Sequence, residues 1–307
     1  MSARENLITV ENHTIEEKLA ACMSTRSWAA QSFYFALKEL LKTKSPLSEA
    51  MLRNHWIDEM RKNQNIYPNG WYLPPPNGIG VLFGTEDKYE RMNYKSLRPE
   101  EMYPKNNILL DKKRGVIYVY ASPVDKKTGM IGDWGMTIYF GKNPEIITHL
   151  QRCLSLNKQV LSYIQVGMTF KEVTIYANTL FTQLHLSNEV TSITDTSSSG
   201  VNVGHTVPAS YENWMSEELE IFNGNDWRNI VNMISKKRKF LNLTEPLPIQ
   251  SGMAFTIEQR LTHRDNPQIP MSSFHTIALI HQNGKKELLT NFDQIFHLTG
   301  MNYMLDI

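Results

Sequence analysis

The sequence predicts an α+β fold built from two similar halves, each with paired helices followed by strands. Helical periodicity runs from about Ile15 to Leu41 and from Ser48 to Arg61, and strand-like stretches follow. The same order returns with helices from about Pro144 to Ile164 and from Lys171 to His185. Helices and strands grouped in this way indicate a sheet covered by helices, so we expect one pseudo-symmetric domain over residues 1–307.

The boundaries of the parts follow from the same pattern. Residues 1–14 precede the first helix as an extension, residues 15–141 form the first half, and residues 142–307 form the second half. An extra helix from Asp226 to Phe240 interrupts the strands of the second half, within an inserted segment at about 209–245. A chain of 307 residues can bury a substantial core, and no stretch resembles an interdomain linker.

Short signals justify the individual elements. Ser45 and Pro46 are expected to cap and begin the second helix. Pro and Gly exclude a helix from 67 to 84, and the small polar stretch 194–200 predicts a loop at the rim of a site. Alternating patterns predict the strands "GVIYVYASPV" and "MTIYFG" in the first half, and "GVNVGHTVP", "GMAFTIEQRL", "FHTIALIHQNG" and "KKELLTN" in the second.

Composition favours an ordinary soluble protein. The chain has 41% hydrophobic and 21% charged residues with a net charge of +1, which favours neither nucleic acid nor a membrane as partner. The basic stretches 111–115 and 235–239 are short and predict solvated faces. No apolar run reaches the roughly 18 residues that span a bilayer, so we expect a cytoplasmic location. Cys22 and Cys153 lack metal-type spacing, and we expect both to be reduced core residues.

One carboxylate, Glu258, stands directly after a run that otherwise predicts a buried strand. An ionised carboxylate inside a sheet costs several kcal/mol unless a cation, hydrogen bonds or a proton compensates it. Partners for Glu258 must therefore come from elsewhere in the chain.

Several motifs occur in an order that is similar to one known family. "VGMTFKEVTIYAN" resembles a turn between paired helices that is usually written PGMTxxDVxxxA, and "GHTVP" resembles an HxxP element. "LPIQSGMAFTIEQRL" resembles a GMxFTIEP strand, and "GDWGMTIYFG" resembles a strand that begins with an aspartate. These are motifs of the creatinase/methionine aminopeptidase family, the M24 peptidases with the "pita-bread" fold, and the resemblance covers roughly residues 15–300. It implies a curved, mainly antiparallel sheet covered by helices.

The resemblance also implies two metal ions held by two Asp, one His and two Glu ligands, of which three carry over. Asp133, His205 and Glu258 match the second aspartate, the HxxP histidine and the first glutamate. Ser122 stands where the first aspartate is expected, and Phe274 stands where the bridging glutamate is expected. The histidine of the family's first half is also missing, because no histidine occurs between His55 and His149.

The three remaining ligands serve one metal in the family, so the resemblance implies a single divalent ion such as Fe, Mn or Zn. Two carboxylates and an imidazole with open positions suit these metals, each of which can polarise a substrate oxygen or activate water. We therefore expect a metal-dependent hydrolase or related enzyme that acts on a small amide, an amino-acid derivative or a short peptide, and not a two-metal aminopeptidase.

Two other interpretations stay open. A metal-free enzyme of the creatinase type would use His275 and His263 with Glu258 as acid and base. A catalytically silent binding protein would resemble the peptidase-like domain of a histone-chaperone complex, and the polar residues would then only hydrogen-bond one another. Dimers are common in the family, so a homodimer is also possible under each interpretation.

Residues around the site give further expectations. We expect an apolar Phe274 ring to fill the space of the second ion and to raise the pKa of the neighbouring carboxylates. The inserted segment is expected to form a lid, a partner surface or a peripheral decoration. Aromatic residues of the first half either fill the core or line a pocket, namely Trp71, Tyr72, Tyr89, Tyr94, Tyr118 and Tyr120.

Overall fold

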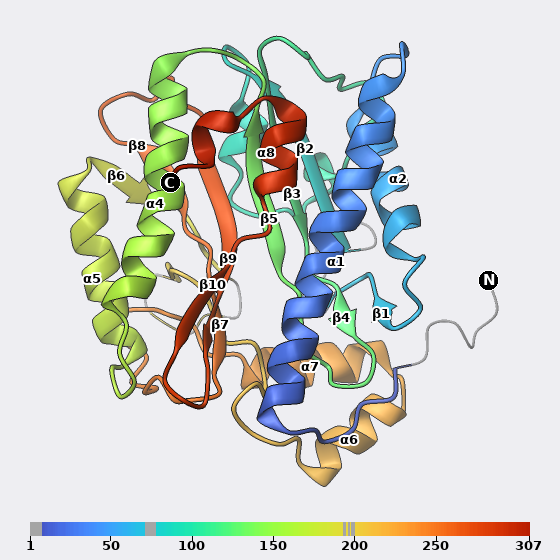
Figure 1. Cartoon of the computed structure of the whole chain (residues 1–307), viewed down its shortest axis with the longest axis vertical. Coiled ribbons are helices and arrows are strands. Elements are labelled where there is room, and N and C mark those ends of the chain that lie inside the picture. Colours follow the sequence, from blue (N-terminus) through green and yellow to red (C-terminus); the bar gives the residue numbers. More distant parts are fainter. Residues whose placement is uncertain (1–7, 71–77, 193–194, 196, 198–199) are drawn as a thin grey trace.

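Paired helices lie over each half of a central sheet (Figure 1). Helix α1 (Ile15–Lys42) packs beside α2 (Glu49–Met60) over the first half, and α4 (Pro144–Tyr163) packs beside α5 (Phe170–Gln183) over the second. The four helices predicted from periodicity are therefore confirmed. The computed structural model describes residues 8–70, 78–192, 195, 197 and 200–307. Trp71, Tyr72 and most of the stretch 194–200 lie outside the described residues.

The central sheet is antiparallel and curled, with the strand order β2-β3-β5-β9-β8-β6, while β7 and β10 also pair with β9. Its strands are β2 (Ile79–Thr85), β3 (Gly115–Ala121), β5 (Trp134–Tyr139), β6 (Leu186–Asn188), β7 (Ala254–Ile257), β8 (Arg260–His263), β9 (Ser272–Ile280) and β10 (Lys286–Leu289). Strand β9 is buried along its whole length and pairs with four other strands at different positions. It therefore joins the two halves into one sheet.

Smaller elements also occur among the described residues. Strands β1 (Ile66–Tyr67) and β4 (Val124–Asp125) form a separate two-stranded ribbon. Short 3-10 helices are η2 (Glu90–Asn93), η3 (Glu100–Met102) and η4 (Asn302–Met304), and α8 (Asp293–Thr299) is a helix near the C-terminus. Helix α8 lies in front of β5 in Figure 1, on the face of the sheet that the other helices cover.

Capping residues explain where two of the long helices begin. Thr14 before α1 and Thr169 before α5 each accept a hydrogen bond from the backbone of a glutamate three residues later, Glu17 and Glu172. Each glutamate in turn accepts a hydrogen bond from the backbone of its threonine, so both helices start with a complete capping box.

The prediction that Ser45 caps α2 is wrong, because the cap is Ser48. The Ser48 hydroxyl accepts a hydrogen bond of 3.2 Å from the backbone N–H of Met51. Ser48 also forms an antiparallel bridge with Leu109, which holds this part of the chain extended up to the first helical residue. This tertiary pairing is not visible in the local sequence.

The inserted segment forms two helices rather than the single one predicted, α6 (Ser216–Asn223) and α7 (Trp227–Lys237). They lie at the end of the molecule where α1 begins (Figure 1). The fully buried Lys18 of α1 anchors the start of the segment, because its ammonium group donates hydrogen bonds to the carbonyl of Ala209 and the side chain of Asn213.

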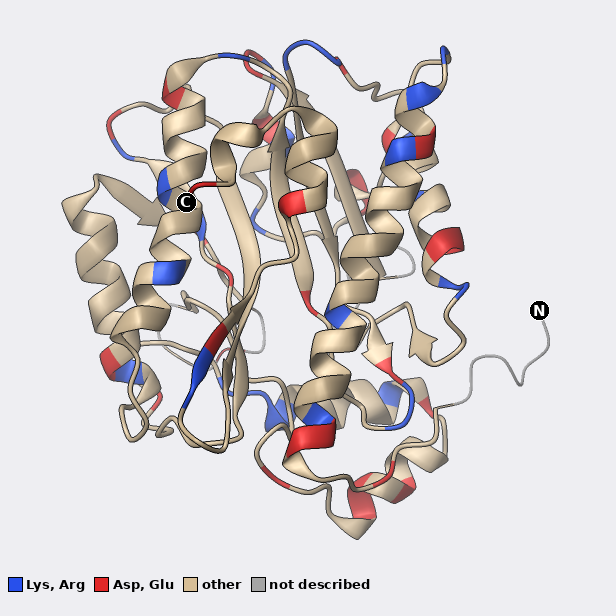
Figure 2. Ribbon diagram, in the orientation of Figure 1, with Lys and Arg blue, Asp and Glu red and all other residues tan. Residues whose placement is uncertain are grey.

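The main core lies between the sheet and the helices. Phe33 of α1, Trp56 of α2 and Trp134 of β5 meet there with ring centroids 4.9 to 5.8 Å apart. Cys22 and Cys153 are buried and form no disulfide, as expected. Charged residues concentrate on helices and loops, and β3 and β5 carry few of them (Figure 2).

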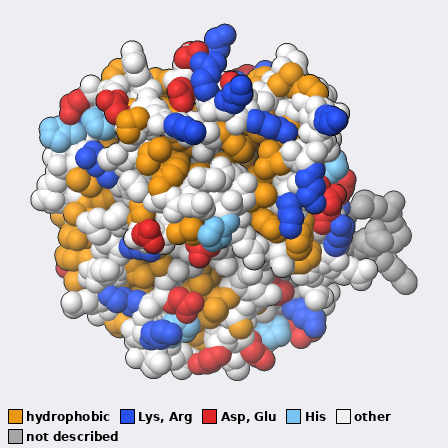
Figure 3. Space-filling view, turned by 45° about the horizontal axis from the view of Figure 1, so that its top comes forward, with side chains coloured by type: hydrophobic (Ala, Val, Ile, Leu, Met, Phe, Trp, Pro, Cys, Tyr) orange, Lys and Arg blue, Asp and Glu red, His pale blue; other side chains and the backbone are white. Residues whose placement is uncertain are grey.

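The surface shows no dominant charge on the face drawn in Figure 3, where basic and acidic side chains are interspersed with hydrophobic ones. Among the described residues, no helix is both long enough and apolar enough to cross a membrane.

A close backbone contact between α1 and the start of β5 generates a prediction. A Cβ at Gly132 would lie 2.3 Å from the backbone nitrogen of Arg26 and 2.4 Å from the carbonyl carbon of Thr25. Gly132→Ala should therefore lower the free energy of unfolding, measured by urea denaturation, by roughly 1–3 kcal/mol. Gly224→Ala is the control, since its Cβ would lie 3.4 Å from the nearest atom and its φ is −66°. Equal stability of the two variants would contradict this prediction.

Candidate functional site

The candidate site lies where β9 passes between the ends of two other strands. Asp133 directly precedes β5, Glu258 directly follows β7, and His275 stands on β9 between them. Gly135 of β5 pairs with His275, and the last residue of β7 pairs with the residue after His275. This register places the Asp133 and Glu258 carboxylates on either side of one imidazole, and all three side chains are buried.

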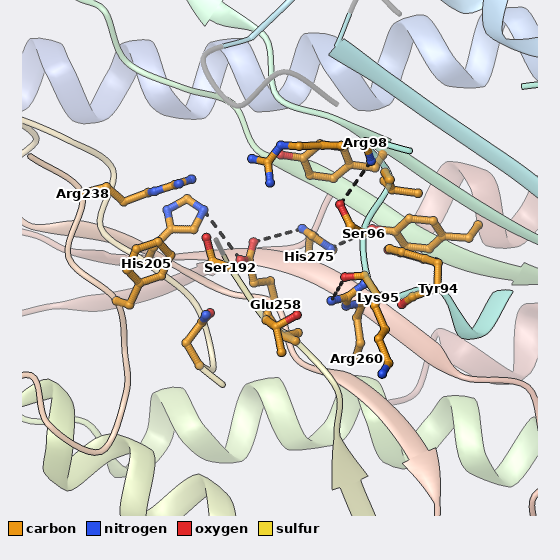
Figure 4. Close-up of a pocket in the computed structure, with 17 residues that line it drawn as sticks. Tyr94, Lys95, Ser96, Arg98, Ser192, His205, Arg238, Glu258, Arg260 and His275 are labelled. Carbon is orange, nitrogen blue, oxygen red and sulfur yellow. Dashed lines mark hydrogen bonds and ion pairs between the residues drawn. The ribbon is translucent and has the colours of Figure 1, made fainter. Parts of the chain in front are cut away.

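His275 is the centre of the arrangement (Figure 4). Its Nδ1 atom lies 3.1 Å from Asp133 Oδ1 and 3.1 Å from Glu258 Oε2, while its Nε2 atom lies 2.9 Å from the hydroxyl of Tyr118. Burial acts to lower the pKa of His275, but the hydrogen bonds to the two carboxylates outweigh it and raise that pKa to about 9. An imidazolium therefore lies between two carboxylates at neutral pH.

His205 approaches Glu258 from the other side. Its Nε2 atom lies 3.6 Å from Glu258 Oε1, and its Nδ1 atom lies 3.0 Å from the carbonyl oxygen of Thr206. Burial lowers the pKa of His205, which favours the neutral imidazole. Burial acts to raise the pKa of Glu258, but His205 and His275 outweigh it and lower that pKa to about 2. Glu258 is therefore ionised and lies between two imidazoles.

Two tyrosines of β3 complete the inner part of the site. The Tyr120 hydroxyl donates a hydrogen bond of 3.1 Å to Asp133 Oδ2, and Tyr118 contacts His275. Burial raises the pKa of Tyr118 well above its usual range, so it stays a phenol. Ser122 follows the last residue of β3 and is fully buried.

The expectation for Phe274 is wrong. Its ring is buried on the other face of β9, where it packs against Phe292 and Phe296 with centroids 5.6 and 6.4 Å away. Neighbouring side chains alternate between the faces of a strand, so His275, and not Phe274, points into the site. Phe274 therefore fills no ion site, and the pKa of Glu258 is lowered rather than raised.

The predicted site residues therefore fall into two places. Asp133, Glu258 and His275 offer ligand atoms within 4.8 Å of one another, and His205 adjoins Glu258. His263 lies elsewhere: its Nδ1 atom accepts hydrogen bonds from the backbone of residues 265 and 266, and it lines a different cavity.

A pocket of about 130 Å³ opens above Glu258, His205 and His275 (Figure 4). Tyr94, Tyr118 and Tyr120 line it. These three aromatic residues therefore line a pocket, which was one of the two alternatives for the aromatic residues of the first half. Its walls also carry four cationic side chains, Lys95, Arg98, Arg238 and Arg260.

The positions of Arg98 and Arg238 in the pocket wall were not predicted. Arg238 belongs to the basic stretch 235–239, which was expected to be solvated, yet it is only 7% exposed. Its guanidinium stacks over Phe240, 4.8 Å from the ring centroid. The signal in the sequence was the Phe that follows the basic run, since an aromatic face attracts a guanidinium.

Comparisons with known proteins found no matching family model and no matching curated protein. Solved structures do match. Methionine aminopeptidase from Rickettsia prowazekii matches with a TM-score of 0.59 and 12% identity over 92% of this chain and 100% of that chain. X-Pro aminopeptidase from Thermotoga maritima matches with a TM-score of 0.57 and 10% identity over 94% of this chain.

A third match is the N-terminal domain of the FACT complex subunit SPT16 from Cicer arietinum, with a TM-score of 0.55 and 10% identity over 89% of this chain. The chain spans 63% of the length of the X-Pro aminopeptidase and 57% of that of the SPT16 domain. The α+β architecture with a curled antiparallel sheet is therefore that of the pita-bread fold, which aminopeptidases and prolidases share.

Proposed function

We propose that this chain is a peptidase-like hydrolase of the M24 type that uses one divalent metal ion beside Glu258 to cleave a small amide or amino-acid-derived substrate. The observation that carries the proposal is the orientation of His205 towards Glu258. The carbonyl oxygen of Thr206 can only accept a hydrogen bond, so the proton of a neutral His205 is on Nδ1. The lone pair of Nε2 therefore faces a carboxylate oxygen.

Two electron pairs that face each other in a buried site favour a cation between them. The distance of 3.6 Å between His205 Nε2 and Glu258 Oε1 is too long for a hydrogen bond. It suits two ligands of one ion, since ligand bonds of about 2.0–2.2 Å place neighbouring donor atoms roughly 3–3.6 Å apart. A histidine whose other nitrogen donates to a backbone carbonyl is also the usual arrangement of a metal ligand.

The remaining ligands come from the same cluster. Glu258 and Asp133 offer carboxylate oxygens, while His275 Nδ1, 3.1 Å from each, stays free to hydrogen-bond them. Such oxygen and nitrogen donors suit Fe(II), Mn(II) or Zn(II). When bound, the ion would supply a Lewis acid for the amide carbonyl and lower the pKa of a water molecule.

The protein side chains supply positioning and proton transfer. His275 lies between the carboxylates and the Tyr118 hydroxyl, so it can receive a proton on one side and pass it to the other. Arg98 and Arg238 extend towards each other across the pocket (Figure 4). Burial and the charge of Arg238 lower the pKa of Arg98, as expected for two neighbouring cations. Two adjacent cations suit the carboxylate of an amino-acid derivative.

One observation favours a second candidate function, a metal-free acid/base enzyme. The His275 imidazolium already lies between the two carboxylates and neutralises part of their charge. In this alternative His275 acts as the acid and Glu258 as the base, while His263 takes no part because it lies in another cavity.

Metal analysis separates the two candidates. Protein purified without a metal column should contain about one equivalent of a divalent ion, and His205→Ala should lose it because Nε2 is removed. His263→Ala is the matched control and should keep the ion. Two equivalents of metal would show that the site is dinuclear. If protein prepared under anaerobic, reducing conditions contains no metal, the remaining interpretations are the metal-free enzyme and the silent binding protein.

Substrate assays test the reaction class. Hydrolysis of N-acyl amino acids should fall at least 100-fold in Glu258→Gln, because this change removes a charge that both imidazoles contact. Met-peptides and Xaa-Pro peptides should be poor substrates, since Ser122 and the turned-away Phe274 offer no ligand for a second ion. Fast turnover of those peptides would contradict the single-ion proposal.

The charge on His275 predicts how stability depends on pH in the presence of a chelator. Its pKa rises from 6.5 to about 9 on folding, so its stabilising contribution is complete below pH 6.5 and is lost as pH rises to 9. The free energy of unfolding should therefore fall over this interval by on the order of 2 kcal/mol.

The His275→Asn variant provides the control for this prediction. It should show a lower free energy of unfolding at pH 6 but a flatter dependence between pH 6.5 and 9. A slope equal to that of the wild-type protein would show that His275 does not titrate there.

A further inference from the structure

We propose that Arg26 is a positioning residue for the site, which holds Asp133 and His275 in place through their backbone carbonyls. Arg26 stands in the middle of α1 and is fully buried. One terminal nitrogen donates to the carbonyl of Asp133, and the other donates to the carbonyls of His275 at 2.7 Å and Thr290 at 2.6 Å. For its effect on metal affinity the inference rests on the proposed function.

These hydrogen bonds act beside a short strand ladder. The ladder between β5 and β9 consists of only two residue pairs, Gly135 with His275 and Met136 with Phe274. Asp133 precedes the first residue of β5, so no strand partner holds its backbone. The guanidinium spans this gap and fixes the distance between the two backbone segments whose side chains meet at 3.1 Å.

Helix α1 is held against the same point by a second contact. Gly132 packs directly on the backbone of Thr25 and Arg26, which leaves no room for a Cβ. The position of the guanidinium relative to Asp133 is therefore set by backbone packing on one side and by hydrogen bonds on the other. A flexible side chain at position 26 could not fix two strands in this way.

The charge of Arg26 also acts on the site. Its guanidinium is fully buried, and the charge of Asp133 is the largest of the influences that favour its protonated form. A link between carbonyls requires only donors, so a buried cation at this position also gives electrostatic support to the Asp133 carboxylate.

Lys18 shows the contrasting case on the same helix. It is also a fully buried cation and also donates to backbone carbonyls, but these belong to the inserted segment at residues 209 and 212. Removal of either cation leaves buried carbonyls without donors, so both variants lose stability. Only the loss of Arg26 should change the site.

Three variants in the full chain test this proposal, Arg26→Lys, Arg26→Met and Lys18→Met. The first measurement is the ¹⁵N-imidazole spectrum of His275 in chelator, which requires no metal and no activity. Both Arg26 variants should shift the His275 Nδ1 signal, because the distance to Asp133 changes, and Lys18→Met should leave it unchanged. Arg26→Lys keeps the charge and is the variant that tests geometry if Arg26→Met fails to fold.

The second measurement is the affinity for Mn²⁺ alone by calorimetry. Residues that hold metal ligands typically contribute 10- to 100-fold to affinity, so we expect that loss in the Arg26 variants and no loss in Lys18→Met. A folded Arg26→Lys protein with the wild-type His275 spectrum would overturn the proposal. If the wild-type chain binds no Mn²⁺, the proposed function fails, and the spectrum alone still decides the role of Arg26.

Discussion

The central constraint on this structure is the burial of two carboxylates beside each other. Asp133 and Glu258 are both nearly inaccessible to solvent, and isolated charges in such surroundings are strongly unfavourable. The chain compensates them with cations from separate elements, namely His275 from β9 and Arg26 from α1. These elements must therefore keep a fixed geometry, and the burial of β9 along its length and the close packing of α1 on Gly132 both restrict their movement.

The inserted segment is tied to the same site. Lys18 of α1 holds the first residues of the segment. Near the other end of the segment, Arg238 and Phe240 line the pocket. An antiparallel bridge between His205 and Phe240 joins that end to the proposed metal ligand. The segment is therefore part of the pocket wall and not only a peripheral decoration, and it brings a cation within electrostatic reach of Glu258.

Much of the fold could be predicted because its signals are local. Helical periodicity and strand alternation both depend on neighbours within a few residues, and the periodicity identified the four long helices correctly. The predictions were wrong for the cap of α2, the face of Phe274 and the exposure of Arg238. In each case the position of the residue depends on segments that are distant in the sequence. For Phe274 the error was one residue in register, and a shift of one residue moves a side chain to the other face of a strand.

Because of this one-residue shift in register, His275 rather than Phe274 points into the site. This changes the chemistry of the site more than the replacement of a glutamate ligand by an apolar ring would. A glutamate on β9 would add a third negative charge, which two divalent ions could neutralise, whereas His275 adds a positive charge when protonated. With Asp133, Glu258, His275 and Arg26 the inner cluster is balanced without any ion. A divalent ion brings two positive charges, and loss of the His275 proton would compensate one of them. A second ion would add two further positive charges with no further carboxylate to offset them, so the arrangement favours at most one ion.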